Sequence, residues 1–214
     1  MKKILGLTVA ALLVMGLVGG GTWAYFSDPE TSTGNILTAG TLDLTLNGGD
    51  SDVKIIDTSV SNIYPGASSS NYTTLVNAGS LAGELEIEFS AITNTGLNDG
   101  SEFADNIGHV GGSANLSVWI DVDGLGVWNS GDIDLESDGT AVPFTTDPTL
   151  DSATIDSFDG VNWNNVYGGS DQFAAAASDR FYITYVVPTS ANNTIQGDSA
   201  SWDITFTLEQ GTAD

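Results

Sequence analysis

The sequence predicts an all-β protein, a jelly-roll-like β-sandwich with loop and short-helix insertions. Five segments alternate apolar and polar residues with the period of a half-buried strand. Turn signals rich in Gly, Pro and Asn separate them, and helical patterns are limited to short pieces near residues 99–107 and 171–178. A chain of 214 residues suits one β-sandwich core, so we expect one globular body behind an N-terminal leader.

Residues 1–24 have the pattern of a secretory signal peptide. Two lysines precede an uncharged apolar run at 4–18, which is shorter than the roughly 20 residues that a membrane-spanning helix needs. Thr22-Trp23-Ala24 places small residues where a signal peptidase accepts them, so we expect cleavage after Ala24. The alternative is a retained anchor helix, but the glycines at 19–21 would interrupt it early.

Residues 25–40 form a predicted N-terminal arm ahead of the sandwich domain at 41–214. Its apolar side chains are those of Tyr25, Phe26, Ile36 and Leu37. Burying an exposed aromatic side chain is worth roughly 1.5–3 kcal/mol, and the extended arm reaches on the order of 40 Å, about the diameter of a domain of this size. The arm therefore either inserts into a neighbouring subunit or folds back onto its own domain, and the residues leave both interpretations open.

The sandwich domain begins with "TLDLTL" at 41–46, in which Leu42, Leu44 and Leu46 share one face. The same alternation predicts three further strands: "ELEIEF" at 84–89, "NLSVWID" at 115–121 and "RFYITYVV" at 180–187. "SWDITFTLE" at 201–209 closes the domain, with Trp202, Ile204, Phe206 and Leu208 on one face. Turns are expected at Tyr64-Pro65-Gly66, at Asn77-Ala78-Gly79-Ser80 and at Gly111-Gly112.

The composition excludes nucleic acid as a partner. Four Lys and Arg residues stand against 28 Asp and Glu, giving a formal net charge of −24, and loss of Lys2 and Lys3 with the leader takes it to −26. Such a chain repels a phosphate backbone. It also has no cysteine, so its core, bound cations or assembly must supply the stability that disulfides give other exported proteins.

The sequence lacks the residue patterns that common hydrolytic enzymes need. A zinc peptidase usually needs at least two histidine ligands and a glutamate base, as in H-E-x-x-H. His109 is the only histidine, and no cysteine replaces the missing ligand. A G-x-S-x-G elbow is also absent from the sequence. We therefore expect no enzymatic activity and assign no catalytic residue.

The segment 121–132, "DVDGLGVWNSGD", predicts a Ca²⁺ loop. Its side-chain oxygens at positions 1, 3, 9 and 12 belong to Asp121, Asp123, Asn129 and Asp132. Val127 at position 7 can offer its carbonyl, and Gly126 at position 6 supplies the sharp turn. Leu125 replaces a usual oxygen ligand and position 12 is not Glu, although Asp134 could complete an irregular site. The loop is therefore either a Ca²⁺ site or a solvated acidic turn.

Two further patterns concern the surface. Sequons for N-glycosylation begin at Asn71, Asn115 and Asn192, and they matter only in an organism that has this machinery. Trp128, Trp163 and Tyr167 lie near Asn-rich loops, which suggests an adhesin or glycan-binding module. Nothing in the spacing of these aromatics separates glycan binding from a role in the core or in lateral contacts.

Four motifs carry a resemblance to a known family. "GGGTWAYFSD", "AGTLDL", "NIYPG" and "NAGSLA" occur in that order, and with them the chain resembles the TasA/camelysin family. They cover the leader and roughly the first 60 residues after it, and the last two strands fit the closing hairpin of the family. Residues 91–179 carry no element that we match.

The resemblance implies a secreted, fibre-forming subunit of a biofilm matrix. In this family a dedicated signal peptidase frees the N-terminal segment, which inserts as a strand into the next jelly-roll subunit. The expected partners are then other copies of the chain, joined head to tail in an extracellular fibre or at the cell surface, together with other matrix components. Part of the family is classed as metallopeptidase, so an enzyme remains an alternative beside the adhesin. Pro29 in the arm and the scarcity of lysine depart from the bacterial matrix proteins of the family.

Overall fold

The computed structural model describes residues 2–20, 39–47, 64–90, 92–95, 109–168, 172–191, 195 and 198–211. The chain divides into two compact units, Met1–Thr38 and Ala39–Asp214, and each is described by itself. The predicted donor residues Tyr25, Phe26, Ile36 and Leu37 lie outside the described residues, as does the expected cleavage position after Ala24.

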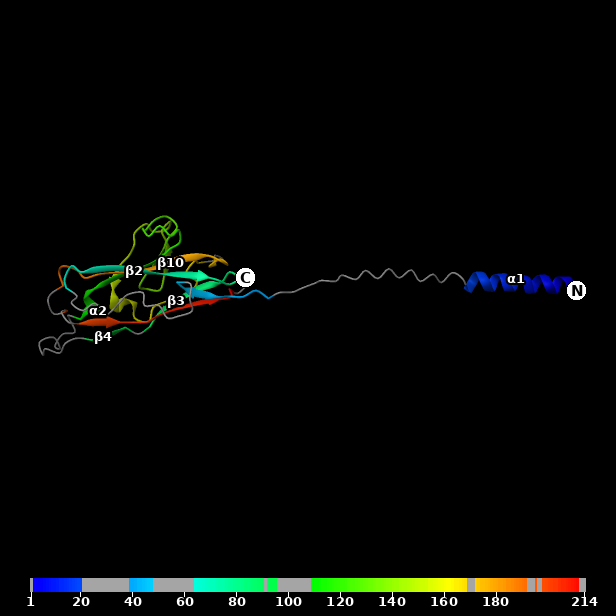
Figure 1. Cartoon of the computed structure of the whole chain (residues 1–214), viewed down its shortest axis with the longest axis horizontal. Helices are drawn as coiled ribbons and strands as arrows, with labels where there is room; N and C mark the ends of the chain where they lie inside the picture. Colours follow the sequence, from blue (N-terminus) through cyan, green and yellow to red (C-terminus); the bar gives the residue numbers. More distant parts are fainter. Residues whose placement is uncertain are drawn as a thin grey trace. The chain divides into compact units, whose positions relative to one another are not determined.

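The described part of the first unit is the helix α1 (Lys2–Gly20) (Figure 1). The apolar side chains between residues 4 and 15 are exposed, for example those of Leu5 and Leu12 at 71% and 64%. Across the described ranges, no helix combines the length and the hydropathy that a membrane crossing requires.

The second unit is a sandwich of antiparallel sheets, so the predicted all-β fold is confirmed (Figure 1). The larger sheet runs in the order β1 (Leu44–Leu46), β2 (Ser68–Asn77), β10 (Ser178–Val186), β5 (Asn115–Asp121), β6 (Ile133–Leu135) and β7 (Ala141–Pro143), with β8 (Ala153–Thr154) beside β5. The other layer holds β12 (Ile204–Glu209), β3 (Glu84–Phe89) and β9 (Asn162–Trp163), together with the pair β11 (Ser199–Ser201) and β4 (Thr93–Thr95).

Three long strands from distant parts of the sequence form the centre of the larger sheet. Within β10, Phe181 lies opposite Thr73 of β2 on one side and opposite Ile120 of β5 on the other. The strands that pair at the centre of this sheet, β2, β10 and β5, are therefore not consecutive in the sequence, as expected for a jelly-roll-like arrangement.

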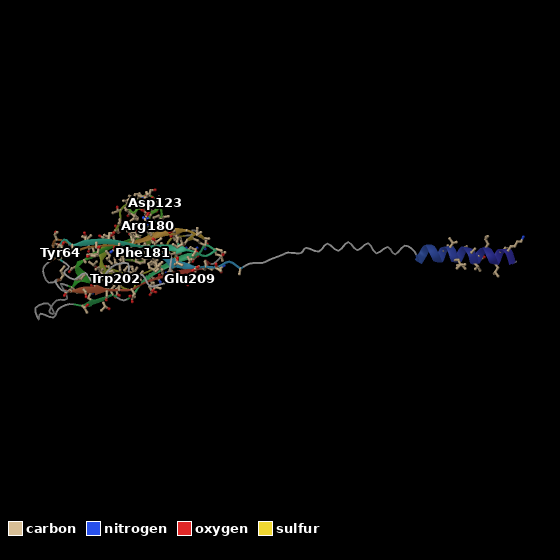
Figure 2. All side chains as sticks on the ribbon, viewed as in Figure 1. Tyr64, Asp123, Arg180, Phe181, Trp202 and Glu209 are labelled. Atoms are coloured by element: carbon tan, nitrogen blue, oxygen red, sulfur yellow. The ribbon has the colours of Figure 1, made fainter. Side chains whose placement is uncertain are left out.

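The core lies between the two layers and is built from the alternating positions that the sequence predicts. Its fully buried side chains include Leu85, Ile87 and Phe89 of β3, Leu116, Val118 and Ile120 of β5, and Phe181 and Ile183 of β10. Phe181 meets Phe206 of β12 edge-on, with ring centroids 5.1 Å apart, and Figure 2 shows Phe181 between the layers. The strands predicted at 84–89 and 115–121 are confirmed with the same bounds.

Two strand predictions need adjustment. The strand expected at 41–46 is limited to β1, because residues 41–43 bond instead to the turn after β2. The strand expected at 201–209 breaks at Trp202 and Asp203, where the chain changes partners from β4 to β3. The Asp203 amide donates to Ser90 Oγ at 2.8 Å and the Ser90 amide donates to the Asp203 carbonyl at 2.9 Å, which holds the break in place.

The turn predicted at Gly111-Gly112 is wrong. Both glycines lie in the short helix α2 (Val110–Ser113), whose first turn is capped by His109. A Cβ at Gly111 would collide with Asp156 and Asn94, so this position needs glycine for close packing rather than for a turn.

The helix expected near 171–178 is also wrong over its described part. Phe173 bridges to Gly83, and β10 begins at Ser178. The short 3₁₀ helix η1 (Ile155–Phe158) was not predicted, and the segment 99–107 lies outside the described residues.

Candidate functional site

The loop between β5 and β6 stands out from the larger sheet. Figure 1 shows this excursion above β2 and β10, and Figure 2 places Asp123 on it, with Arg180 beneath. Gly126 has φ +74, and a Cβ there would lie 2.9 Å from the Tyr182 hydroxyl oxygen. The sequence assigned the sharp turn to this glycine, and its left-handed backbone agrees with that.

Three of the predicted metal ligands come together in this loop. Asp121, Asp123 and Asp132 each offer a carboxylate oxygen, and these oxygens lie within 4.8 Å of one another. Asp121 and Asp132 are fully buried at the ends of β5 and β6, whereas Asp123 is exposed. The loop therefore has a buried anionic base and one carboxylate that reaches solvent.

Backbone amides orient all three carboxylates. Asp121 accepts from the amides of Gly124 at 2.7 Å and Gly126 at 2.9 Å, and Asp123 accepts from Leu125 at 2.9 Å. These contacts hold the loop closed around its acidic side chains.

Asn129 and Val127, the other predicted ligands, contact each other within the loop. The backbone amide of Asn129 donates to Asp132 Oδ2 at 2.8 Å, and the side-chain amide of Asn129 donates to the Val127 carbonyl at 2.9 Å. Val122 donates to the other oxygen of Asp132 at 3.1 Å. Asn129 thus positions Asp132, and ligation by Asn129 or by the Val127 carbonyl stays a prediction.

Arg180 was missed by the sequence analysis. It lies opposite Asp121 in the register of β10 and β5, with Nη1 3.6 Å from Asp121 Oδ2 and 2.6 Å from the Gly124 carbonyl, to which it donates. Its guanidinium also sits 5.0 Å from the ring centroid of Tyr72. The only arginine of the chain therefore offsets part of the negative charge under the loop.

The pKa values within the loop move in opposite directions. Burial raises the pKa of Asp132, and the charges of Asp121 and Asp123 raise it further. The Leu125 amide lowers the pKa of the exposed Asp123 carboxyl. A cation would relieve the repulsion that disfavours the ionised form of Asp132.

Asp134 belongs to a second acidic cluster rather than to the loop. Its ligand oxygen groups with those of Glu136 and Asp151, again within 4.8 Å of one another. Burial raises the pKa of Asp134 to about 7, and Asp151 and Glu136 add to that shift. Asp134 therefore does not complete the loop as the sequence suggested.

An incomplete edge of the sandwich is the second candidate site. β12 pairs with β3 on one side, and no described strand pairs with its other side. Its core-facing residues Ile204, Phe206 and Leu208 are only half-buried, although their cross-strand partners on β3 are fully buried. The core is therefore thin along this edge.

The two sequence motifs that begin the domain pack against each other. The amides of Ser80 and Leu81 donate to the Thr41 carbonyl at 2.9 and 3.1 Å, and the Thr41 amide donates to Ser80 Oγ at 2.9 Å. A Cβ at Gly79 would collide with the Thr41 carbonyl. "AGTLDL" and "NAGSLA" thus form one structural joint where the described domain begins.

Asn77 is the centre of this joint and is fully buried. Its side-chain amide donates to the carbonyls of Leu81 at 2.8 Å and Phe173 at 3.1 Å, and its Oδ1 accepts from the Gly79 amide at 3.0 Å. One side chain therefore connects the turn after β2 to the segment before β10.

His109 has a structural role. Its Nδ1 accepts from the Gly112 amide at 3.1 Å and lies 3.5 Å from Asp156 Oδ2. Neither of the acidic clusters found among the described residues includes it. The geometry around His109 is that of a helix cap.

The aromatics proposed for glycan binding do not form a common surface. Trp163 is fully buried and donates to the Glu136 carbonyl at 2.8 Å, so its exposed role is wrong. Tyr167 stacks on Phe173 and donates to Asp179. Trp128 packs edge-on against Trp119 and Phe144.

The sequons differ in accessibility. Asn71 is exposed on β2, and Asn115 is half-buried at the start of β5. Asn192 lies outside the described residues. Of the two described, Asn71 is the more accessible acceptor.

Comparison with known proteins gives one family. The family model described as camelysin metallo-endopeptidase matches residues 1–214. The match includes the stretch 91–179, where the motifs of the sequence analysis found no counterpart. Among curated proteins, none matches the chain.

Proposed function

Because the chain belongs to the camelysin metallo-endopeptidase family, which includes TasA, we propose that it is a structural subunit of an extracellular filament. Secretion frees the N-terminal arm, and the arm of one subunit adds as a strand to the next. The observation that carries this proposal is the half-buried edge strand β12.

An added strand would complete two features of that edge. It would cover Ile204, Phe206 and Leu208, whose partners on β3 are already fully buried. It would also pair with the outward backbone groups of β12, which is how β-augmentation generates affinity. Burial at about 25 cal/mol per Å² of apolar surface then adds to main-chain hydrogen bonding.

The arm has the chemistry that this edge requires. Tyr25, Phe26, Ile36 and Leu37 supply apolar side chains at both ends of a segment long enough to reach another subunit. The joint at Thr41 and Ser80 gives the arm a firm point of origin. A head-to-tail contact that does not close on itself produces a fibre rather than a ring.

We propose a structural and not a peptidase role within this family. His109 caps α2 and lies outside the acidic clusters of the described residues, which supports that assignment. The chain's main partner is then its own copy, with other matrix components or the cell surface as further contacts.

Ca²⁺ binding by the loop is a second part of the proposal. Asp121, Asp123 and Asp132 are close enough to share one ion, and hard oxygen ligands favour Ca²⁺. The bound ion would stiffen a loop that projects from the sheet, so the site is structural in this proposal.

Electron microscopy of two purified forms tests the filament. Residues 25–214 should polymerise into thin filaments, whereas a form with extra residues before Tyr25 should stay monomeric because its arm no longer begins at the aromatic pair. Monodisperse monomers of residues 25–214 across pH and salt would overturn the proposal, and would favour an arm folded back onto its own domain.

A further inference from the structure

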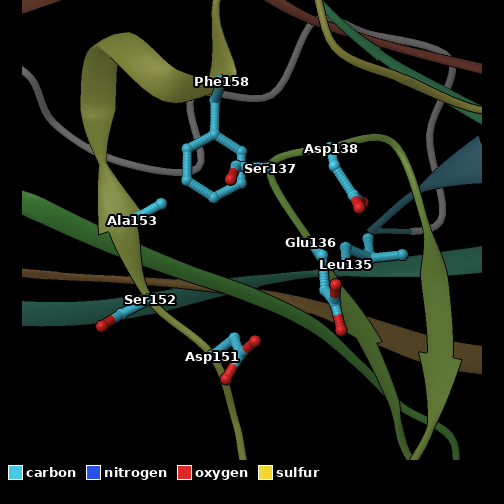
Figure 3. A pocket seen from close by; sticks show the side chains of 8 residues that line it. All are labelled: Leu135, Glu136, Ser137, Asp138, Asp151, Ser152, Ala153 and Phe158. Carbon is cyan, nitrogen blue, oxygen red and sulfur yellow. The ribbon is translucent and has the colours of Figure 1, made fainter.

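The outer face of β6 carries a second group of carboxylates, distinct from the loop. Ile133 and Leu135 point into the core, so Asp134 and Glu136, at alternating positions, lie on the opposite face of the sheet. Asp151 reaches the same place from the segment before β8. Figure 3 shows the Glu136 and Asp151 side chains turned toward each other beside a pocket that Asp138 also lines.

Asp134 provides an observation independent of this clustering. Its side chain is 2% exposed, and Oδ2 accepts from the Asp151 amide at 2.7 Å. Oδ1 is buried and has no hydrogen-bond partner. A carboxylate oxygen buried in this way is costly unless a donor or a cation satisfies it.

The surroundings of this oxygen are anionic. Among the described residues, no basic side chain forms an ion pair with Asp134, Glu136 or Asp151. In the loop, by contrast, Arg180 approaches Asp121. The second cluster thus has a stronger need for a cation than the first.

We propose that Asp134, Glu136 and Asp151 bind a divalent cation, with Ca²⁺ as the best-fitting ion. Ca²⁺ lies about 2.3–2.6 Å from its oxygens, so ligands on opposite sides of it are up to about 5 Å apart. The three carboxylate oxygens, within 4.8 Å of one another, fit one such coordination sphere. The donor set is all oxygen, which disfavours zinc.

The neighbouring pocket supplies room for the remaining ligands. It has a volume of about 160 Å³, and its lining is part polar and part apolar: Leu135, Glu136, Ser137, Asp138, Asp151, Ser152, Ala153 and Phe158. Water entering from this side completes the six to eight ligands that Ca²⁺ prefers. The ion would tie the segment before β8 to the end of β6.

Counting bound Ca²⁺ on the full-length chain by equilibrium dialysis tests the site. The wild type should bind one ion in the loop and one on β6. Asp134→Asn/Asp151→Asn should lose one ion, and Asp121→Asn/Asp123→Asn should lose the other. Asp134→Asn keeps an acceptor for the Asp151 amide, so the variant retains that contact. Asp43→Asn/Glu88→Gln, which removes the same charge from exposed positions, should bind as the wild type does.

Terbium gives a readout specific to the second site. Trp163 donates to the Glu136 carbonyl and so lies close enough to sensitise a bound Tb³⁺ ion. In the Asp121→Asn/Asp123→Asn background, Trp-excited Tb³⁺ luminescence should persist, and adding Glu136→Gln should weaken Tb³⁺ binding at least tenfold. Absence of luminescence in that background, or an unchanged ion count in Asp134→Asn/Asp151→Asn, would overturn the β6 site. An unchanged ion count in Asp121→Asn/Asp123→Asn would overturn only the loop site.

Discussion

Asp121 and Asp134 are both buried carboxylates, yet they have different hydrogen-bond and charge partners. Asp121 accepts two backbone amides and has Arg180 nearby, whereas Asp134 has one amide and an oxygen with no partner. Residue type and exposure alone therefore do not determine how a buried carboxylate is stabilised, because the strand register decides which groups surround it.

The loop carboxylates lead to a prediction about Ca²⁺. Binding at 100 times the dissociation constant should stabilise the protein by about 2.7 kcal/mol and raise its melting temperature. Asp121→Ala/Asp123→Ala should lose the loop's share of the Ca²⁺ gain and keep the share of the β6 site, because these residues supply two of the three clustered oxygens of the loop. Thermal unfolding in Ca²⁺ and in Mg²⁺ separates specific binding from screening of the large negative charge. An equal gain for both proteins in either ion would show that the loop is an acidic turn.

The pH dependence of the metal-free protein follows from Asp134. Its pKa rises from an ordinary value of 3.8 to about 7 on folding, so the folded protein holds more protons than the unfolded chain between these values. The free energy of unfolding should therefore be highest near pH 4 and should fall as the pH rises toward 7. Asp134→Asn should reduce this fall, as measured by denaturant unfolding at several pH values.

Other carboxyl groups with shifted pKa values also affect the pH dependence of unfolding and provide its control. The pKa values of Asp132 and Asp179 are also raised by burial, so the fall should be reduced rather than abolished. The hydroxyl and amide of Thr140 lower the pKa of Asp138, which is the opposite sign. Asp138→Asn should therefore leave the fall intact, and an equal effect of both variants would contradict the assignment to Asp134.

His109 leads to a prediction about proteolysis. Hydrolysis of casein should be undetectable with or without added zinc, because His109 caps α2 and has no clustered metal ligands among the described residues. The assay follows release of soluble peptides from casein. Chelator-sensitive proteolysis that His109→Ala abolishes would reverse the proposal of a non-enzymatic protein.

At the scale of elements, the sequence predicts strands well where one face is covered. Residues 84–89 alternate strictly, and their apolar side chains all reach the core. The pattern fails where the chain changes partners, as at Trp202 and Asp203, because periodicity does not record which strand lies alongside. It also fails at Gly111, where glycine serves close packing inside a helix.

In the candidate sites, too, local sequence patterns predict some residues, whereas others come together only through strand pairing. The three clustered carboxylates of the loop could be grouped from the sequence because their spacing along the chain is local. Arg180 and the β6 cluster were missed, because Arg180 meets Asp121 only through strand pairing, and Asp151 meets Asp134 only through the fold. No local signal in the sequence brings these residues together.

The joint at Asn77 allows a test of an element contact. Asn77→Ala should lower the free energy of unfolding by about 2–4 kcal/mol, because it removes three hydrogen bonds from a fully buried side chain, including the one that the Gly79 amide donates. Asn71→Ala is the matched control, since Asn71 is exposed on the same strand, and it should change stability by less than about 0.5 kcal/mol. Equal effects in urea unfolding would show that the joint does not matter.

At the scale of the whole molecule, charge opposes the proposed assembly. The chain carries a net charge of −24, and the charge becomes −26 if the leader is removed. Subunits of this charge repel one another, and salt or bound divalent cations reduce the repulsion. Assembly through β12 must therefore be driven by backbone pairing and apolar burial at the edge rather than by attraction between charges.

We predict that a single substitution in β12 blocks filament growth. In residues 25–214, Leu208→Glu should prevent polymerisation, because it places a charge among the half-buried, core-facing side chains that the incoming strand would cover. Thr205→Glu is the control, since it adds the same charge to the same strand at an exposed position facing away from the core. Both variants should first show the melting behaviour of a folded domain, so that loss of assembly is not loss of structure. Filaments are then counted by electron microscopy at high salt, where the added charge is screened. If Leu208→Glu folds and still forms filaments as well as Thr205→Glu does, the arm inserts elsewhere and β12 is not the acceptor.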